Sequence, residues 1–118
     1  MGEPGLQNRR ANSKAHIYRD VGADQFVLED TLEGDVTDKF SGFGASLAVD
    51  GTTVVVGAPN ADVVACNVVN AGVAYVFYKN TTDPLGSWYL HQQFFPPDPK
   101  PTDDFASSVD ISGNIIVV

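Results

Sequence analysis

The chain repeats part of its own sequence. A stretch of fourteen residues that begins at Phe43 returns 62 residues later, beginning at Phe105. The apolar runs of the two copies coincide, and two further pairs of identical residues fix the alignment, Ser46 with Ser108 and Gly51 with Gly113. A fixed period of this length, made of short segments, predicts a solenoid or a propeller rather than an ordinary closed domain.

The repeat also extends upstream of these two copies. Residues 15–18 match residues 74–77 at a spacing of 59, so that one loop has gained three residues. The alignment divides the chain into an outer half-unit at 15–32, a whole unit at 43–94 and an inner half-unit at 105–118. This organisation predicts a piece of a longer array, in which the two half-units would together make one more unit.

The pattern of side chains predicts antiparallel strands. Within each copy, residues 43–56 and 105–118, large and small side chains alternate and a glycine-containing turn precedes a β-branched run, as in a hairpin. We expect Asp50 and Gly51 to supply two positive-φ positions in the first of these turns. Gly57 would allow either a close approach of another backbone or a bulge, and Pro59 would end the strand.

Two more strands complete the whole unit. The third, at about 73–78, places Val73, Tyr75 and Phe77 on one face. Four alternating residues are expected to share a face of the fourth strand, namely Trp88, Leu90, Gln92 and Phe94. Four antiparallel strands joined by short turns are typical of a propeller blade.

Composition and charge exclude several classes of function. The net charge of −8 would repel a phosphate backbone, so we expect no nucleic-acid partner. No stretch approaches the roughly 20 apolar residues of a membrane-spanning helix. Cys66 is the only cysteine and cannot form an internal disulfide. Residues 1–14 lack apolar periodicity and are predicted to be a disordered leader or linker before the repeat region at 15–118.

Several residues resemble a known family. Phe43-Gly44 followed by Gly57-Ala58-Pro59 is similar to the FG-GAP repeat, and the segment 72–77 and Trp88 fit the rest of that unit. The resemblance implies an all-β fold, in which antiparallel four-stranded blades form a propeller like that of integrin α-subunit heads and many microbial surface proteins. The chain would contribute one whole blade flanked by two half-blades.

The chain departs from the family pattern at two places. Phe105-Ala106 replaces Phe-Gly in the second copy, a change that a small residue tolerates. Calcium-binding members carry a loop of alternating Asp and Asn ligands between the Phe-Gly and Gly-Ala-Pro strands, but here the connection is only Asp50-Gly51. One carboxylate cannot supply the six to eight oxygen ligands of calcium. We therefore expect no metal and no cofactor, as in a short-turn variety of the repeat.

No residue pattern indicates catalysis. Four oxygen-bearing side chains gather on one loop, at Asn60, Asp62, Asn67 and Asn70, but such residues are also ordinary turn formers. The adjacent carboxylates Glu29-Asp30 and Asp103-Asp104 would face opposite sides of a strand, and His16 and His91 accompany no nucleophile motif. We expect no catalytic residue. Asn80-Thr81-Thr82 is a possible glycosylation sequon in a predicted turn.

These observations favour a non-enzymatic interaction module. The family resemblance implies a propeller that contacts a protein or glycan ligand, outside the cell or at its surface. Neighbouring blades of a longer propeller would be its other partners. Two alternatives remain: an accessory propeller of a hydrolase whose catalytic domain lies outside this chain, and a propeller that is itself catalytic, because fold alone does not fix function.

Overall fold

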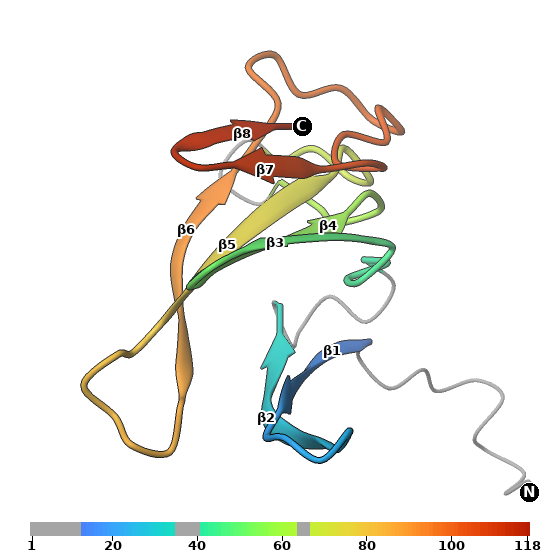
Figure 1. The fold of residues 1–118 in the computed structure, drawn as a ribbon. Coiled ribbons are helices and arrows are strands. Elements are labelled where there is room, and N and C mark those ends of the chain that lie inside the picture. Colours follow the sequence, from blue (N-terminus) through green and yellow to red (C-terminus); the bar gives the residue numbers. More distant parts are fainter. Residues whose placement is uncertain (1–12, 35–40, 64–66) are drawn as a thin grey trace, which may run out of the picture.

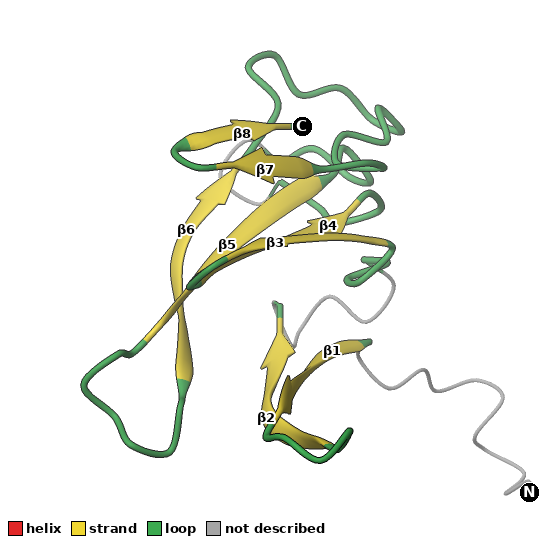
Figure 2. Ribbon diagram, in the orientation of Figure 1, coloured by secondary structure: helices red, strands yellow, loops and turns green. Residues whose placement is uncertain are grey.

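The fold consists of β-strands and loops. The computed structural model describes residues 13–34, 41–63 and 67–118, and Figure 2 shows no helix among them. The strands are β1 (Lys14–Asp20), β2 (Phe26–Glu33), β3 (Ser46–Asp50), β4 (Thr53–Ala58), β5 (Val73–Lys79), β6 (Trp88–Phe94), β7 (Asp110–Ser112) and β8 (Ile115–Val117). Every pairing between them is antiparallel. The predicted all-β, antiparallel fold is confirmed.

The strands form three sheets. Strands β3, β4, β5 and β6 make one four-stranded sheet in that order, which we call the blade. Strands β1–β2 and β7–β8 make two separate two-stranded sheets, which we call the outer and inner half-blades. Figure 1 shows the half-blades on opposite sides of the blade. The half-units therefore do not join within one chain, as their complementary sequences had suggested, because the blade lies between them.

Each face of the blade is covered by one half-blade. Ala15 and Leu32 of the outer half-blade join Val56, Tyr75 and Phe77 in the larger core cluster. A second, smaller cluster on the other face is built on small blade residues and is covered by the inner half-blade; it comprises Val55, Ala74, Val76 and Ala106, with Val109, Ile111 and Ile116 packed against them. The central strands are thus buried on both sides, which explains the continuous Val54-Val55-Val56 run.

The outer half-blade (β1–β2) and the β5–β6 pair of the blade share one register and one irregularity. Strand β2 has an extra residue, Glu29, between the partners of Ile17 and Tyr18, and strand β6 has an extra residue at the matching position, His91. Such a bulge adds one residue to one strand and shifts the alternation of the side chains beyond it. The two bulges lie 62 residues apart, so they belong to the repeat.

The bulge corrects the prediction for the fourth strand. Trp88 belongs to the larger core cluster, whereas Phe94 packs against the smaller cluster on the opposite face. The expected common face of these residues is wrong because His91 interrupts the alternation between them. By contrast, Val73, Tyr75 and Phe77 of β5 share one face as predicted.

The hairpin turns also differ in detail from the prediction. Asp50 pairs with Thr53, so the two residues of the turn are Gly51 and Thr52. Of these, only Gly51 has a positive φ, of 60°. A positive φ at the first turn position alone is the pattern of a type II′ turn, which suits the twist of a hairpin. Asp50 is therefore the last residue of β3 rather than a residue of the turn.

The Phe-Gly segments precede the strands rather than forming part of them. Phe43 lies in a turn before β3, and its ring packs edge-on against Tyr75 with centroids 5.2 Å apart. Gly44 has a φ of 93°, and Ala106 at the matching position of the next unit has a φ of 71°. The replacement of glycine by Ala106 is thus tolerated in a backbone conformation that favours glycine.

Gly57 marks the closest approach between successive units. The pairing of β4 with both neighbouring strands is regular at this residue, so no bulge occurs there. A Cβ atom at position 57 would overlap the carbonyl oxygen of Ala106 and the hydroxyl of Ser46. The Ser46 hydroxyl itself donates a hydrogen bond to that Ala106 oxygen (3.1 Å). Of the two roles predicted for Gly57, close approach of another backbone is the observed one.

Substitution of Gly57 by Ala should detach the inner half-blade from the blade. The new methyl group would collide with the Ala106 backbone, and overpacking of this kind costs about 1–3 kcal/mol. Denaturant unfolding should show this loss, and hydrogen exchange should show faster exchange of the β7 and β8 amides. Gly51→Ala is the control, since a Cβ at that position meets nothing within 4 Å and strains only the local turn. Unchanged exchange of the β7 and β8 amides in Gly57→Ala would contradict the assigned role.

Candidate functional site

Loops from three parts of the chain meet at one edge of the blade. The amide of Asn60 donates to the carbonyl oxygen of Ser41 (2.8 Å), and the amide of Gly72 donates to that of Ala61 (2.9 Å). The amide of Phe105, in the next unit, donates to the carbonyl oxygen of Ala71 (3.0 Å). We call this group of segments, residues 41–45, 57–63, 67–72 and 104–107, the loop edge. The first two of these hydrogen bonds lie within one unit, and the third joins that unit to the next.

The oxygen-bearing residues of the long loop shape its backbone. Asn67 and Asn70 have φ values of 55° and 56°, a conformation that asparagine adopts more easily than most residues. The Asp62 carboxylate accepts a hydrogen bond from the amide of Asn70 (2.9 Å). Val63 and Val68 form an isolated antiparallel bridge between them. The amide side chains of Asn60, Asn67 and Asn70 remain exposed at the surface.

A carboxylate cluster joins the outer half-blade to the blade. Glu29, at the bulge of β2, accepts hydrogen bonds from the guanidinium of Arg19 and from the indole N–H of Trp88 (2.7 Å). The Lys79 ammonium lies 3.3 Å from the same carboxylate. Beside it, the Asp30 carboxylate accepts a hydrogen bond from the Trp88 amide (2.7 Å). Because Arg19 belongs to the half-blade while Trp88 and Lys79 belong to the blade, Glu29 links the two sheets.

The cluster has a strong effect on the acidity of Glu29. The hydrogen bond from Arg19, followed by those from Trp88 and Lys79, lowers the pKa of Glu29 from 4.5 to about 2, against the opposing effect of burial. The side chain of Glu29 is only 7% exposed. The sequence did not predict this cluster. Adjacent carboxylates of a regular strand face opposite sides, and nothing in the sequence indicated the bulge that turns Glu29 toward the blade.

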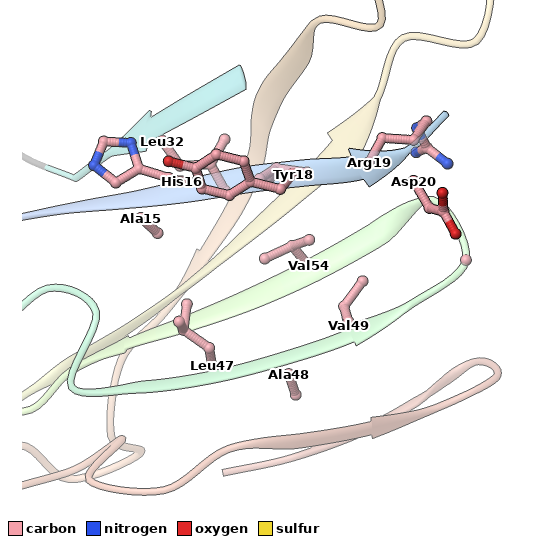
Figure 3. Close-up of a pocket in the computed structure, with 12 residues that line it drawn as sticks. Ala15, His16, Tyr18, Arg19, Asp20, Leu32, Leu47, Ala48, Val49 and Val54 are labelled. Atoms are coloured by element: carbon pink, nitrogen blue, oxygen red, sulfur yellow. The ribbon is translucent and has the colours of Figure 1, made fainter. Parts of the chain in front are cut away.

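A groove lies beside this cluster, between β1 and the β3–β4 hairpin. Its volume is about 480 Å³, and its walls come from β1 and from the inner strands of the blade. In Figure 3, Leu47, Val49 and Val54 point into the space beneath β1. Leu47 is 55% exposed and Val49 is 65% exposed, unusual values for aliphatic residues on the face of a blade. The outer half-blade covers only part of this face.

The residues predicted to carry the repeat motif lie in or beside the core. Phe43, Ala58 and Ala106 are buried, and Phe105 is partly buried against the smaller cluster. The amide of Gly44 donates to the carbonyl oxygen of Gly57 (3.1 Å), and β4 ends at Ala58, directly before Pro59. These residues bring successive units together, and none of them presents a chemically reactive group.

Asn80 lies at the start of the turn between β5 and β6. Its side-chain oxygen accepts a hydrogen bond from the Thr82 amide (3.1 Å) and one from the Thr82 hydroxyl (2.7 Å). The sequon therefore forms a local turn at the far end of the β5–β6 hairpin (Figure 1). Its predicted modification stays a prediction.

The remaining candidates are dispersed. His16 shares a hydrogen bond with the Thr31 hydroxyl (3.1 Å), and His91 stacks on Tyr78 with ring centroids 4.0 Å apart. The Asp103 carboxylate accepts a hydrogen bond from the Lys100 amide (3.0 Å). Within residues 13–34, 41–63 and 67–118, no three His, Cys, Asp or Glu side chains gather as metal ligands. The same residues include no helix of the length and hydropathy needed to cross a membrane. Cys66 lies outside the described residues.

The stability of the chain should fall in acid because of Glu29. Its pKa in the folded state, about 2, lies below the ordinary value of 4.5, so its contribution is complete above about pH 4.5 and is lost as the pH falls toward 2. Glu29→Gln should cost about 2 kcal/mol at pH 7, since it removes hydrogen bonds to a charged group. This deficit should shrink toward pH 2. Unfolding curves between pH 2 and pH 7 would measure both effects, with Glu33→Gln, an exposed position of the same strand, as the control. An equal deficit for Glu29→Gln at both ends of this range would contradict the assignment.

Calcium should neither bind tightly to the β3–β4 connection nor stabilise the chain. That connection is only two residues long, and the carboxylate of Asp50 beside it accepts a hydrogen bond from the Gly113 amide of the next hairpin (2.7 Å). A calorimetric titration with calcium chloride should give no heat above dilution. Micromolar affinity that disappears in Asp50→Ala would show that the prediction is wrong.

Comparison with known families agrees with this architecture. Residues 29–77 match the family model of the FG-GAP repeat, a segment that runs from β2 to β5. It contains the Phe43-Gly44 and Gly57-Ala58-Pro59 motifs. No curated protein and no solved structure gives a significant match to the chain. The predicted resemblance is confirmed for this segment: residues 29–77 of the chain match the FG-GAP repeat.

Proposed function

We propose that the chain is a non-enzymatic interaction module of a β-propeller, whose loop edge binds a protein or glycan ligand outside the cell or at its surface. The observation that carries this proposal is the convergence of loops from successive units. Hydrogen bonds join the backbone near Ser41, the long loop after β4 and the segment at Phe105. Strands hold these loops at one edge, an arrangement in which rigid scaffolds commonly carry binding residues.

The chemistry of the loop edge suits recognition by hydrogen bonding. Exposed amide side chains can donate and accept at the same time, which matches the hydroxyl groups of sugars and the backbone of a peptide. Asn60, Asn67 and Asn70 supply such groups. Val69 between them is 54% exposed and adds an apolar contact. Because Asn67 and Asn70 also fix the backbone of the loop, these groups are held before a ligand arrives, which lowers the entropy cost of binding.

A hydrolase accessory role is the alternative. Several carboxylates of the described residues already take part in ion pairs or turns, among them Glu29, Asp62 and Asp83. On this alternative, a catalytic domain outside this chain supplies the activity of the parent protein. The coding sequence on either side would distinguish the two proposals, since further repeats or an anchor favour adhesion and a hydrolase motif favours the accessory role.

The binding proposal can be tested with a glycan array and with a panel of cell-surface proteins. A ligand that uses the loop edge should lose at least about tenfold in affinity in Asn60→Ala and in Val69→Ser. Leu85→Ser should bind as the unchanged chain does, since Leu85 is 83% exposed and belongs to the β5–β6 turn, which lies far from the loop edge (Figure 1). A ligand affected by Leu85→Ser and not by the other two would place binding elsewhere. Turnover of a glycan on the array would contradict a non-enzymatic role.

A further inference from the structure

The two half-blades have complementary free edges. The inner half-blade, β7–β8, repeats β3–β4 at a spacing of 62, and the outer half-blade, β1–β2, repeats β5–β6 with the same register and the same bulge. Within the blade, these two halves join through the pairing of β4 with β5. The corresponding strands of the half-blades, β8 and β1, each pair on one side only in the described structure.

We propose that β8 of one copy of this chain pairs with β1 of a second copy, so that two half-blades from two chains complete one four-stranded blade. The blade itself predicts the register. Val54 pairs with Phe77 and Val55 pairs with Val76. Transferred by the repeat, Ile116 would lie opposite Tyr18 of the second copy, and Val117 opposite its Ile17. The contact joins different surfaces of the two copies, a head-to-tail arrangement that builds rings when the rotation closes.

The exposed apolar residues of the two copies match in this arrangement. Inside one chain, Val55 is fully buried in the cluster against which Val109, Ile111 and Ile116 pack. By the 62-residue repeat, Val117 corresponds to Val55. Leu47, Val49 and Val54 correspond in the same way to Val109, Ile111 and Ile116. Val117 is 63% exposed and would enter the groove that Leu47 and Val49 line. The groove is therefore the counterpart of a packed interface that the chain already contains.

The polar contact between the sheets is also matched, with donor and acceptor exchanged. Glu29 of the outer half-blade contacts Lys79 and Trp88 of the blade. By the repeat, His91 corresponds to Glu29, Asp20 to Lys79 and Phe26 to Trp88. At the boundary between copies, His91 of one copy would therefore face Asp20 and Phe26 of the other. The carboxylate becomes an imidazole, the ammonium becomes a carboxylate, and the indole N–H donor becomes a phenyl ring. An imidazole N–H can donate to a carboxylate, and a phenyl ring needs no hydrogen-bond acceptor, so the three changes together preserve complementarity.

The second copy explains the exposed residues better than an unrelated partner does. Phe26 is 63% exposed on β2, and His91 stacks on Tyr78, which packs against the smaller core cluster. Phe26 corresponds to Trp88 and His91 corresponds to Glu29, and Trp88 and Glu29 contact each other between the sheets. The packing of β7 on β3 and the Glu29 contact show that this chain already uses such an interface between its own units.

Sedimentation velocity of the full 118-residue chain over a wide concentration range is the first test. We expect reversible, concentration-dependent assembly. Leu47→Asp in the groove and Val117→Asp on β8 should each weaken it at least about tenfold, because a charge would enter an apolar contact. Leu85→Asp is the matched control, since it adds the same charge at a more exposed leucine in the β5–β6 turn. A monomer at all concentrations, or assembly unaffected by both variants, would overturn the proposal.

Cross-linking tests the register independently of affinity. Two single-cysteine chains, Ile17→Cys and Val117→Cys, each carrying Cys66→Ser, would be mixed under oxidising conditions. Facing residues of antiparallel strands have Cβ atoms about 4.5–5.5 Å apart, close enough for a disulfide after small adjustment. We expect a mixed dimer from this pair and little from Val117→Cys mixed with Val27→Cys on the neighbouring strand. Equal cross-linking of both mixtures would indicate unspecific association and contradict the predicted register.

A charge exchange tests the polar contact. His91→Glu and Asp20→Lys would each place like or unmatched charges at the boundary and should weaken assembly. The double variant recreates the Glu29–Lys79 pair between copies and should restore it. Circular dichroism of each variant would verify that the fold is intact. Failure of the double variant to assemble better than either single variant would contradict the proposed position of His91. Binding of a ligand to the loop edge does not enter these measurements, so their failure leaves the proposed function standing.

Discussion

The structure depends on the burial of both faces of the central strands by neighbouring units. Strands β4 and β5 carry apolar side chains on each face, and a single sheet cannot shield both from water. The outer half-blade covers one face through Ala15 and Leu32, and the inner half-blade covers the other through Val109, Ile111 and Ile116. At roughly 25 cal/mol for each Å² of apolar surface, this burial is the main stabilising term. Removal of either unit would expose the apolar face of the blade that it covers.

The two interfaces differ because the two faces of the blade differ. One carries aromatic side chains, with Phe43 packed edge-on against Tyr75, and it takes up the outer half-blade through these large groups. The other carries Gly57 and Ala74 and lets the backbone at Ala106 approach directly. A large face and a small face on each blade allow successive blades to stack in one direction only. The Glu29 cluster adds a polar contact at the outer part of the first interface, where Trp88 and Lys79 can reach it.

The residues that hold the units together differ from those that a ligand could contact. The motif residues and the two core clusters are occupied in holding units together, so the chemistry available to a ligand lies in the connections. The hydrogen bonds at Ser41, Ala61 and Ala71 transmit the regular stacking of the sheets to the loops at one edge. Variation in those loops can change a binding specificity without disturbing the burial on which the fold depends.

The β-strands, their antiparallel order and the division into one whole unit and two halves could be predicted from the sequence. These features follow from local alternation, turn residues and the 62-residue repeat, none of which depends on tertiary contacts. The face on which each half-blade lies and the residues that join the sheets depend on how the sheets stack, and they could not be predicted from these patterns. The bulges at Glu29 and His91 leave no local signal in the apolar pattern, yet each extra residue reverses the faces beyond it, and this separated Trp88 from Phe94. The role of Glu29 as the link between sheets was also not predictable, because its partners Trp88 and Lys79 are distant in sequence and meet it only when the sheets stack.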